Sequence, residues 1–155
     1  MIILDNITLY ADGAARGNGS KDALCGYGTV LLDFKNKRKK EMKYACRGAT
    51  NNIMEIKAVI VGLKALKKSC NVDIYTDSQY VVNTFNKGWI YNWKKNGWVK
   101  GDKKPVKNKE LWIELLTLVE YHNCTFNWVK GHSTNKWNNY CDQLANEAMD
   151  EYLNK

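Results

Sequence analysis

Alternating apolar and polar residues predict three strands in the first third of the chain. The predicted strands are Ile7 to Ala11, residues 25–34 ("CGYGTVLLDF") and residues 40–48 ("KEMKYACRG"), with a turn at "KNKRK" between the last two. Because the three strands follow one another at short spacing, the pattern predicts an antiparallel meander.

After the meander the apolar residues recur at helical spacing, from Asn52 to Lys68. The remaining elements are a buried strand at 71–77 ("NVDIYTD"), a short helix at 78–86, a helix at 110–122, a strand at 124–131 and a last amphipathic helix from about Asn139 to Leu153. Helices that alternate with strands favour parallel pairing. The predicted fold is therefore α/β: a five-stranded mixed sheet, with a three-strand antiparallel meander plus two parallel strands, flanked by helices.

Residues 87–109, the Trp/Lys segment, interrupt this pattern. The segment interleaves tryptophans with lysines and holds the only proline of the chain, Pro105. It contains too many helix and strand breakers to form one regular element. The whole chain has 24 Lys and Arg residues against 16 Asp and Glu residues, a net charge of +8. This excess favours a polyanionic partner, and lysine suits the tracking of a phosphate backbone better than the reading of bases.

The length of 155 residues predicts one domain, 1–155. The five cysteines are odd in number and form no Cys-x-x-Cys pair, so neither a disulfide framework nor a zinc site is indicated. We expect a reducing, intracellular and cytoplasmic setting, and a monomer. The apolar start "MIILDNITLY" is typical of a strand rather than a signal peptide, and no apolar stretch is long enough to span a membrane.

Carboxylates fall at matching places in the predicted layout. Asp12 closes the first strand, Asp77 closes the strand 71–77, and Asp142 lies in the first turn of the last helix. Glu55 lies in the first turn of the long helix. If the strands are parallel neighbours, these side chains meet at the carboxyl edge of the sheet. Carboxylates crowded there repel one another and, unless some of them are protonated, imply bound cations, of which Mg²⁺ or Mn²⁺ suits the oxygen ligands best.

Each of these residues also has a purely structural interpretation. Asp12-Gly13 resembles a turn, Asp77-Ser78 a helix N-cap, Asn52-x-x-Glu55 a capping box, Asp142 a charge at a helix N-terminus and His132 an ordinary surface histidine.

Five segments resemble the type 1 ribonucleases H, in the order of that family and over nearly the whole chain. They are "YADG" (10–13), "TNNIMEIKA" (50–58), "YTDSQYV" (75–81), "WIYNWKKNGWVKGDKKPVKN" (89–108) and "WVKGHS" with "NNYCDQLA" (128–145). The resemblance implies an endonuclease that hydrolyses the RNA strand of RNA/DNA hybrids, largely without sequence preference. It also implies one catalytic domain with a basic protrusion at about 87–109, no separate hybrid-binding domain, and therefore weak, distributive binding.

The resemblance also assigns roles to residues. It makes Asp12, Glu55, Asp77 and Asp142 the metal-binding carboxylates, and His132 a mobile loop histidine that accepts a proton or assists product release. It places Asn18, Asn51, Asn52 and Gln79 in contact with the minor groove and Thr50 near a phosphate. The Trp/Lys segment would grip the DNA strand, through Trp89, Trp93, Trp98, Lys94, Lys95, Lys103 and Lys104.

The resemblance further implies a two-metal-ion mechanism with Mg²⁺, or Mn²⁺, that leaves 5′-phosphate and 3′-hydroxyl ends. Asp12 would bridge both ions, with Asp142 on the side of the attacking water and Glu55 and Asp77 on the leaving-group side. Neutral Asn and Gln side chains can recognise the 2′-hydroxyl that distinguishes RNA from DNA.

Two other functions remain open at the level of sequence. A non-catalytic hybrid-binding module would have no reason to retain the four carboxylates. A junction resolvase or transposase core of the same fold would not need the Trp/Lys segment or "TNN". The loop "GNGSKDALCGYG" also lacks the proline of the bacterial Gly-Asn-Pro-Gly pattern, which leaves the role of Asn18 open.

Overall fold

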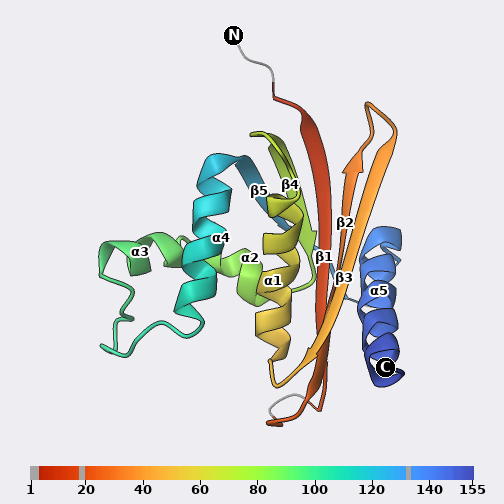
Figure 1. Ribbon diagram of the computed structural model, residues 1–155. Helices are drawn as coiled ribbons and strands as arrows, with labels where there is room; N and C mark the ends of the chain where they lie inside the picture. The colour runs from red at the N-terminus through yellow and green to blue at the C-terminus, as the bar shows by residue number, and fades with distance from the viewer. Residues whose placement is uncertain (1–3, 18–19, 132–133) are drawn as a thin grey trace.

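The computed structural model describes residues 4–17, 20–131 and 134–155. The described residues form one five-stranded sheet in the order β3-β2-β1-β4-β5 (Figure 1). The strands are β1 (Asn6–Arg16), β2 (Leu24–Asp33), β3 (Arg38–Arg47), β4 (Asn71–Thr76) and β5 (Asn123–Trp128). β1, β2 and β3 pair antiparallel, whereas β4 pairs parallel with β1 and β5 pairs parallel with β4. The predicted mixed sheet is confirmed.

Helices cover both faces of the sheet. They are α1 (Asn51–Lys64), α2 (Gln79–Asn86), α3 (Trp89–Lys95), α4 (Lys109–Tyr121) and α5 (Lys136–Leu153). α5 packs alone on one face, against β1, β2 and β3, while α1 packs on the other face with α4 beside it (Figure 1). Among the described residues, none of the helices combines the length and the apolar character needed to cross a bilayer.

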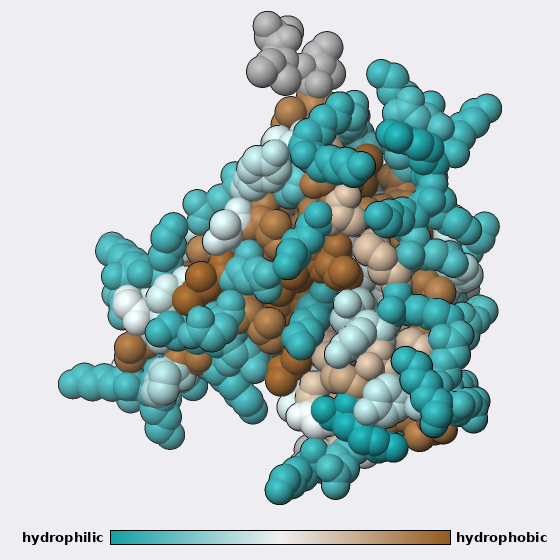
Figure 2. Space-filling view, in the orientation of Figure 1, coloured by the Kyte–Doolittle hydropathy of each residue, from teal (hydrophilic) through white to brown (hydrophobic). Residues whose placement is uncertain are grey.

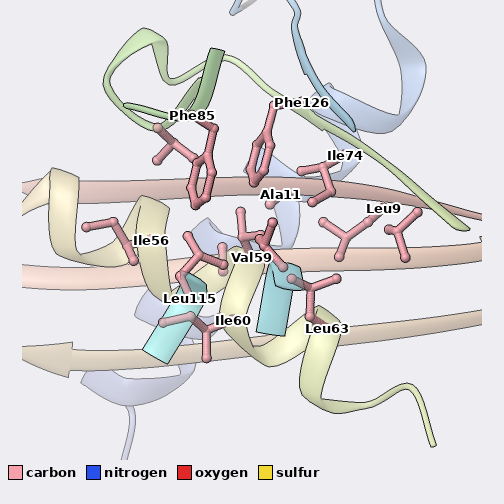
Figure 3. Close-up of a cluster of buried hydrophobic side chains, with 14 of the residues drawn as sticks. Leu9, Ala11, Ile56, Val59, Ile60, Leu63, Ile74, Phe85, Leu115 and Phe126 are labelled. Carbon is pink, nitrogen blue, oxygen red and sulfur yellow. The ribbon is translucent and has the colours of Figure 1, made fainter. Parts of the chain in front are cut away.

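The main core lies between the sheet and α1. Leu9, Ile74, Val59 and Leu63 are fully buried there, at the interface of β1, β4 and α1 (Figure 3). The rings of Phe85 and Phe126 stack with their centroids 4.2 Å apart. Each fully buried side chain of this size stabilises the fold by about 1.5–3 kcal/mol relative to exposure. This core holds α1 against β1 and β2.

The first strand is longer than its apolar pattern predicts. β1 does not end at Asp12 but continues to Arg16, and Asp12 and Gly13 pair with Gly28 and Tyr27 of β2. The interpretation of Asp12-Gly13 as a turn is therefore wrong. Gly13 is needed for a different reason: a Cβ atom there would lie 2.4 Å from the backbone nitrogen of Glu55. The glycine lets α1 approach the strand closely.

The Trp/Lys segment is irregular, as predicted, but it begins with a short helix that the sequence did not indicate. α3 covers Trp89–Lys95, and an isolated bridge joins Val99 to Pro105 farther along. In Figure 1 this segment extends away from the sheet, beyond α4. Hydrophilic side chains project from the same part of the molecule in Figure 2.

Candidate active site

The register of the parallel strands places two carboxylates at one level. Ala11 of β1 pairs with Thr76, the last residue of β4, so that Asp12 and Asp77 are the next residues along their chains. Beyond this level, among the described residues, β1 pairs only with β2. Asp12 and Asp77 therefore lie where the parallel part of the sheet ends, the position at which open α/β sheets carry their sites.

The third carboxylate comes from α1. Thr50 is the N-cap of this helix, and its hydroxyl accepts a hydrogen bond from the backbone nitrogen of Ile53 at 3.1 Å. Glu55 thus lies beyond the first turn, and both the predicted first-turn position and the capping box from Asn52 are wrong. The close approach at Gly13 also provides a backbone hydrogen bond to the Glu55 carboxylate.

The fourth carboxylate, Asp142, lies on α5. Asn135 caps this helix by accepting a hydrogen bond from the backbone nitrogen of Asn138 at 2.9 Å, so the helix starts earlier than predicted. Asp142 is consequently in the second turn rather than the first. The interpretation of Asp142 as a charge that stabilises the helix N-terminus is therefore wrong. A Cβ atom at Gly28 would lie 2.3 Å from the Cys141 carbonyl oxygen, so this glycine lets α5 approach β2 closely.

Asp12, Glu55 and Asp77 form a carboxylate cluster. One oxygen from each lies within 4.8 Å of the others, and Asp12 and Glu55 are only 5% and 3% exposed. None of the ion pairs between described residues includes Asp12 or Glu55. Burial raises the pKa of Asp12 well above its ordinary range, and the charges of Glu55, Asp77 and Asp142 raise it further. Burial and the charge of Asp77 likewise raise the pKa of Glu55.

These observations fit a divalent cation site. Oxygen ligands crowded in a buried position are costly to ionise together unless positive charge is held among them. The donor set contains only carboxylate oxygens, which hard cations such as Mg²⁺ and Mn²⁺ prefer. The described residues thus supply an acidic cluster that suits a divalent metal.

A cleft of about 560 Å³ lies over the carboxylate cluster. Asp142 lines it together with the three cluster residues, so the four predicted carboxylates share one cleft. The predicted minor-groove residues Asn51, Asn52 and Gln79 line the same cleft, whereas Thr50 serves as the helix cap just described. Ala14, Ala15, Ser78 and Tyr80, which sequence reasoning did not select, complete much of its wall.

The three tryptophans that were predicted to contact the DNA strand differ in their surroundings. Trp89 is 38% exposed, with the Lys87 ammonium 5.7 Å from its ring centroid. Trp93 and Trp98 are partly buried and pack against the main core. Of the lysines predicted to contact the DNA strand, Lys94 forms an ion pair with Glu120 at 3.3 Å. The other three, Lys95, Lys103 and Lys104, are exposed.

Three residues that contact Asp77 or Glu55 were not predicted from the sequence. The indole nitrogen of Trp128 donates to the backbone oxygen of Asp77 at 3.1 Å, and a Cβ atom at Gly131 would lie 2.6 Å from the Asp77 carboxylate. The hydroxyl of Thr76 donates to Glu55 Oε2 at 3.3 Å. Contacts of this kind join residues that are distant in the chain, and no local pattern signals them. Asn18 and His132 lie outside the described residues.

The strand order, the helices on both faces and the carboxylate cluster at the end of the parallel pairing define an α/β protein with a ribonuclease H-like fold. A family model described as RNase H matches residues 5–150. The chain belongs to the ribonuclease H family, and the prediction of a hydrolase of this family is confirmed.

Known relatives support the assignment over most of the chain. A protein named Ribonuclease H from Clostridium botulinum is 50% identical over 149 residues, which are 96% of this chain and 99% of the relative. Another from Desulforamulus reducens is 52% identical over 92% of this chain and 86% of the relative.

Solved structures agree with the sequence relatives. The crystal structure of LC9-RNase H1, a type 1 RNase H with the type 2 active-site motif, matches with a TM-score of 0.86 and 26% identity, over 97% of this chain and 75% of that one. LC11-RNase H1 in complex with RNA/DNA hybrid matches with a TM-score of 0.72 and 26% identity, over 95% and 99% of the two chains.

Proposed function

We propose that this protein is an endonuclease, in one catalytic domain, that hydrolyses the RNA strand of RNA/DNA hybrids and leaves 5′-phosphate and 3′-hydroxyl ends. The observation that carries the proposal is the buried carboxylate cluster beneath a polar cleft in a basic protein. Membership of the ribonuclease H family and the hybrid bound to LC11-RNase H1 support this substrate.

We propose Asp12, Glu55, Asp77 and Asp142 as the ligands of two Mg²⁺ ions, with Mn²⁺ as the alternative. When bound, these ions supply Lewis acidity: they activate water and stabilise the charge that develops on the phosphate and on the departing 3′ oxygen. Asp12 lies within 4.8 Å of Glu55 and Asp77, measured between carboxylate oxygens, and the charge of Asp142 also acts on it. This position suits a residue that would help hold both ions.

The protein's own residues set the charge of the site. Because burial raises the pKa of Asp12 and Glu55, these carboxyls retain protons unless positive charge is nearby. Cation binding at neutral pH therefore displaces protons from the cluster. His132, whose ordinary pKa is about 6.5, is proposed from the sequence alone to accept a proton or assist product release.

Selectivity is proposed to come from the cleft wall. Asn51, Asn52 and Gln79 present amide groups that both donate and accept hydrogen bonds, which suits a 2′-hydroxyl. The exposed face of Trp89 is proposed to contact a deoxyribose of the other strand. The exposed lysines of the Trp/Lys segment are proposed to bind phosphates without reading bases, so cleavage would be largely independent of sequence.

The test is cleavage of a labelled RNA/DNA hybrid in Mg²⁺, beside RNA/RNA and DNA/DNA duplexes of the same sequence and a four-way DNA junction. We expect the protein to cut only the RNA of the hybrid, and Asp12→Asn to cut nothing. Preference for the junction would favour a resolvase instead. Binding of the hybrid without cleavage in Mg²⁺ or Mn²⁺ would show a binding module.

A further inference from the structure

The hydroxyl of Thr76 connects two parts of the site. Thr76 is the last residue of β4, directly before Asp77, and it is fully buried. Its Oγ1 accepts a hydrogen bond from the backbone nitrogen of Ser78 at 3.1 Å and donates one to Glu55 Oε2 at 3.3 Å. One side chain therefore contacts both the turn that carries Asp77 and the carboxylate of Glu55.

The two hydrogen bonds determine where the hydroxyl proton points. A hydroxyl has one proton to donate, whereas a backbone N–H can only donate. The Ser78 N–H therefore occupies a lone pair of Thr76 Oγ1, and the single proton of Thr76 is left for Glu55 Oε2, which is ionised when a cation is bound. In a buried site such a charge-assisted bond is stronger than in water, and it restricts the rotation of the carboxylate.

The two other buried threonines among the described residues, Thr29 and Thr84, do not act in this way. Thr29 and Thr84 are also fully buried, but their hydroxyls donate to the backbone oxygens of Ala58 and Tyr80, at 2.6 and 2.7 Å. Those bonds satisfy a buried hydroxyl within the fold, the ordinary situation for such a group. Thr76 instead directs its hydroxyl at an ionisable member of the carboxylate cluster.

We propose that Thr76 is a positioning residue, which orients the Glu55 carboxylate toward Asp12 and Asp77 so that the three can hold a cation. The proposal rests on the role of Glu55 as a cation ligand proposed above. Groups that hydrogen-bond to metal ligands in this way typically change metal affinity by about 10–100-fold when removed.

The experiment measures cation binding without nucleic acid, by titrating the full chain with Mn²⁺ and following the paramagnetic resonance signal of free Mn²⁺. Thr76→Val removes the hydroxyl and retains the shape of the side chain. We expect it to weaken Mn²⁺ binding about tenfold. Thr76→Ser retains the hydroxyl, so its affinity should stay within about threefold of that of the unchanged protein.

Thr29→Val is the matched control, because it removes a buried threonine hydroxyl that also bonds to α1 but does not bond to a carboxylate. Its Mn²⁺ affinity should be unchanged even if its stability falls. Wild-type affinity in Thr76→Val would overturn the proposal. Equal losses in Thr76→Val and Thr76→Ser, or an equal loss in Thr29→Val, would also overturn it, because the hydroxyl of Thr76 would then not be the cause.

Glu55→Gln separates this inference from the proposed function. If Glu55→Gln weakens Mn²⁺ binding but Thr76→Val does not, the role of Glu55 stands and that of Thr76 fails. If Glu55→Gln binds Mn²⁺ like the unchanged protein, Glu55 is not a ligand and both proposals fail at this residue. Urea denaturation of every variant checks that it is folded under the conditions of the titration.

Discussion

At the scale of single residues, the raised pKa values of Asp12 and Glu55 predict an unusual dependence of stability on pH. The folded protein holds these two protons more tightly than the unfolded chain does. Their contribution to the free energy of unfolding is therefore present below their unfolded pKa values of about 4 and is lost as the pH rises toward the raised folded values. In metal-free buffer we expect this contribution to fall by about 1–3 kcal/mol as the pH rises from the unfolded pKa values to the folded ones.

Urea denaturation in metal-free buffer at a series of pH values measures this dependence. Asp12→Asn isolates it, because the difference in stability between this variant and the unchanged protein should grow as the pH rises. Adding Mg²⁺ at neutral pH should stabilise the unchanged protein more than the variant, since the cation binds the folded state only. A constant difference across the pH series would contradict the expectation.

Asp12→Asn has opposite expected effects on activity and on stability. Asn is neutral without binding a proton, whereas folding of the unchanged protein must protonate Asp12 at neutral pH, so the metal-free variant should gain about 1–2 kcal/mol. It also removes the central proposed ligand, so cleavage of the hybrid should fall by about 1,000-fold or more. The free energy of unfolding is measured by urea denaturation and the cleavage rate by an assay on the hybrid, both on the same preparation of each protein. Loss of activity together with loss of stability would indicate a structural role for Asp12.

At the scale of elements, the contact between β1 and α1 sets the position of Glu55. Gly13→Ala places a Cβ atom 2.4 Å from the Glu55 backbone nitrogen, so strand and helix must separate. We expect a loss of about 2–3 kcal/mol in unfolding free energy, with a fall in cleavage activity as Glu55 moves away from Asp12. Gly101→Ala is the control, because a Cβ atom there meets nothing within 4 Å. Similar stability losses in the two variants would show that close packing at Gly13 is not the cause.

At the scale of the whole molecule, charge is separated between the acidic cleft and the lysines of the Trp/Lys segment. If Lys103 and Lys104 each contact a phosphate, replacing both by alanine should weaken hybrid binding and reduce the slope of log affinity against log salt by about two. Binding of a non-cleaved hybrid at several salt concentrations, in Ca²⁺ or with Asp12→Asn, measures the slope. Lys35→Ala with Lys40→Ala, on the β2–β3 hairpin, removes the same charge and should leave the slope nearly unchanged.

Much of the fold follows from local patterns. Period-two alternation identified the three strands of the meander, and helical spacing identified α1, α4 and α5 to within a few residues. One error lies where a tertiary contact overrides the local signal: β1 runs past Asp12 because β2 continues to pair with it. Another is a local signal that the apolar pattern did not include: α5 starts at Lys136 because Asn135 caps it. Trp93 and Trp98 pack on the core; α3 lies beside α2, and the ring centroid of Trp93 is 6.2 Å from that of Trp112 on α4.

The sequence by itself determined the fold class, the basic character of the molecule and the four acidic residues to examine, because periodicity, charge and residue type are local properties of the chain. Only the tertiary structure decided that Asp12, Glu55 and Asp77 lie within 4.8 Å of one another and that Thr76 bonds to Glu55. Those distances depend on strand register and on the close approach of helices at Gly13 and Gly28. Register and close packing are set by the whole core at once, so they cannot be read from any single segment.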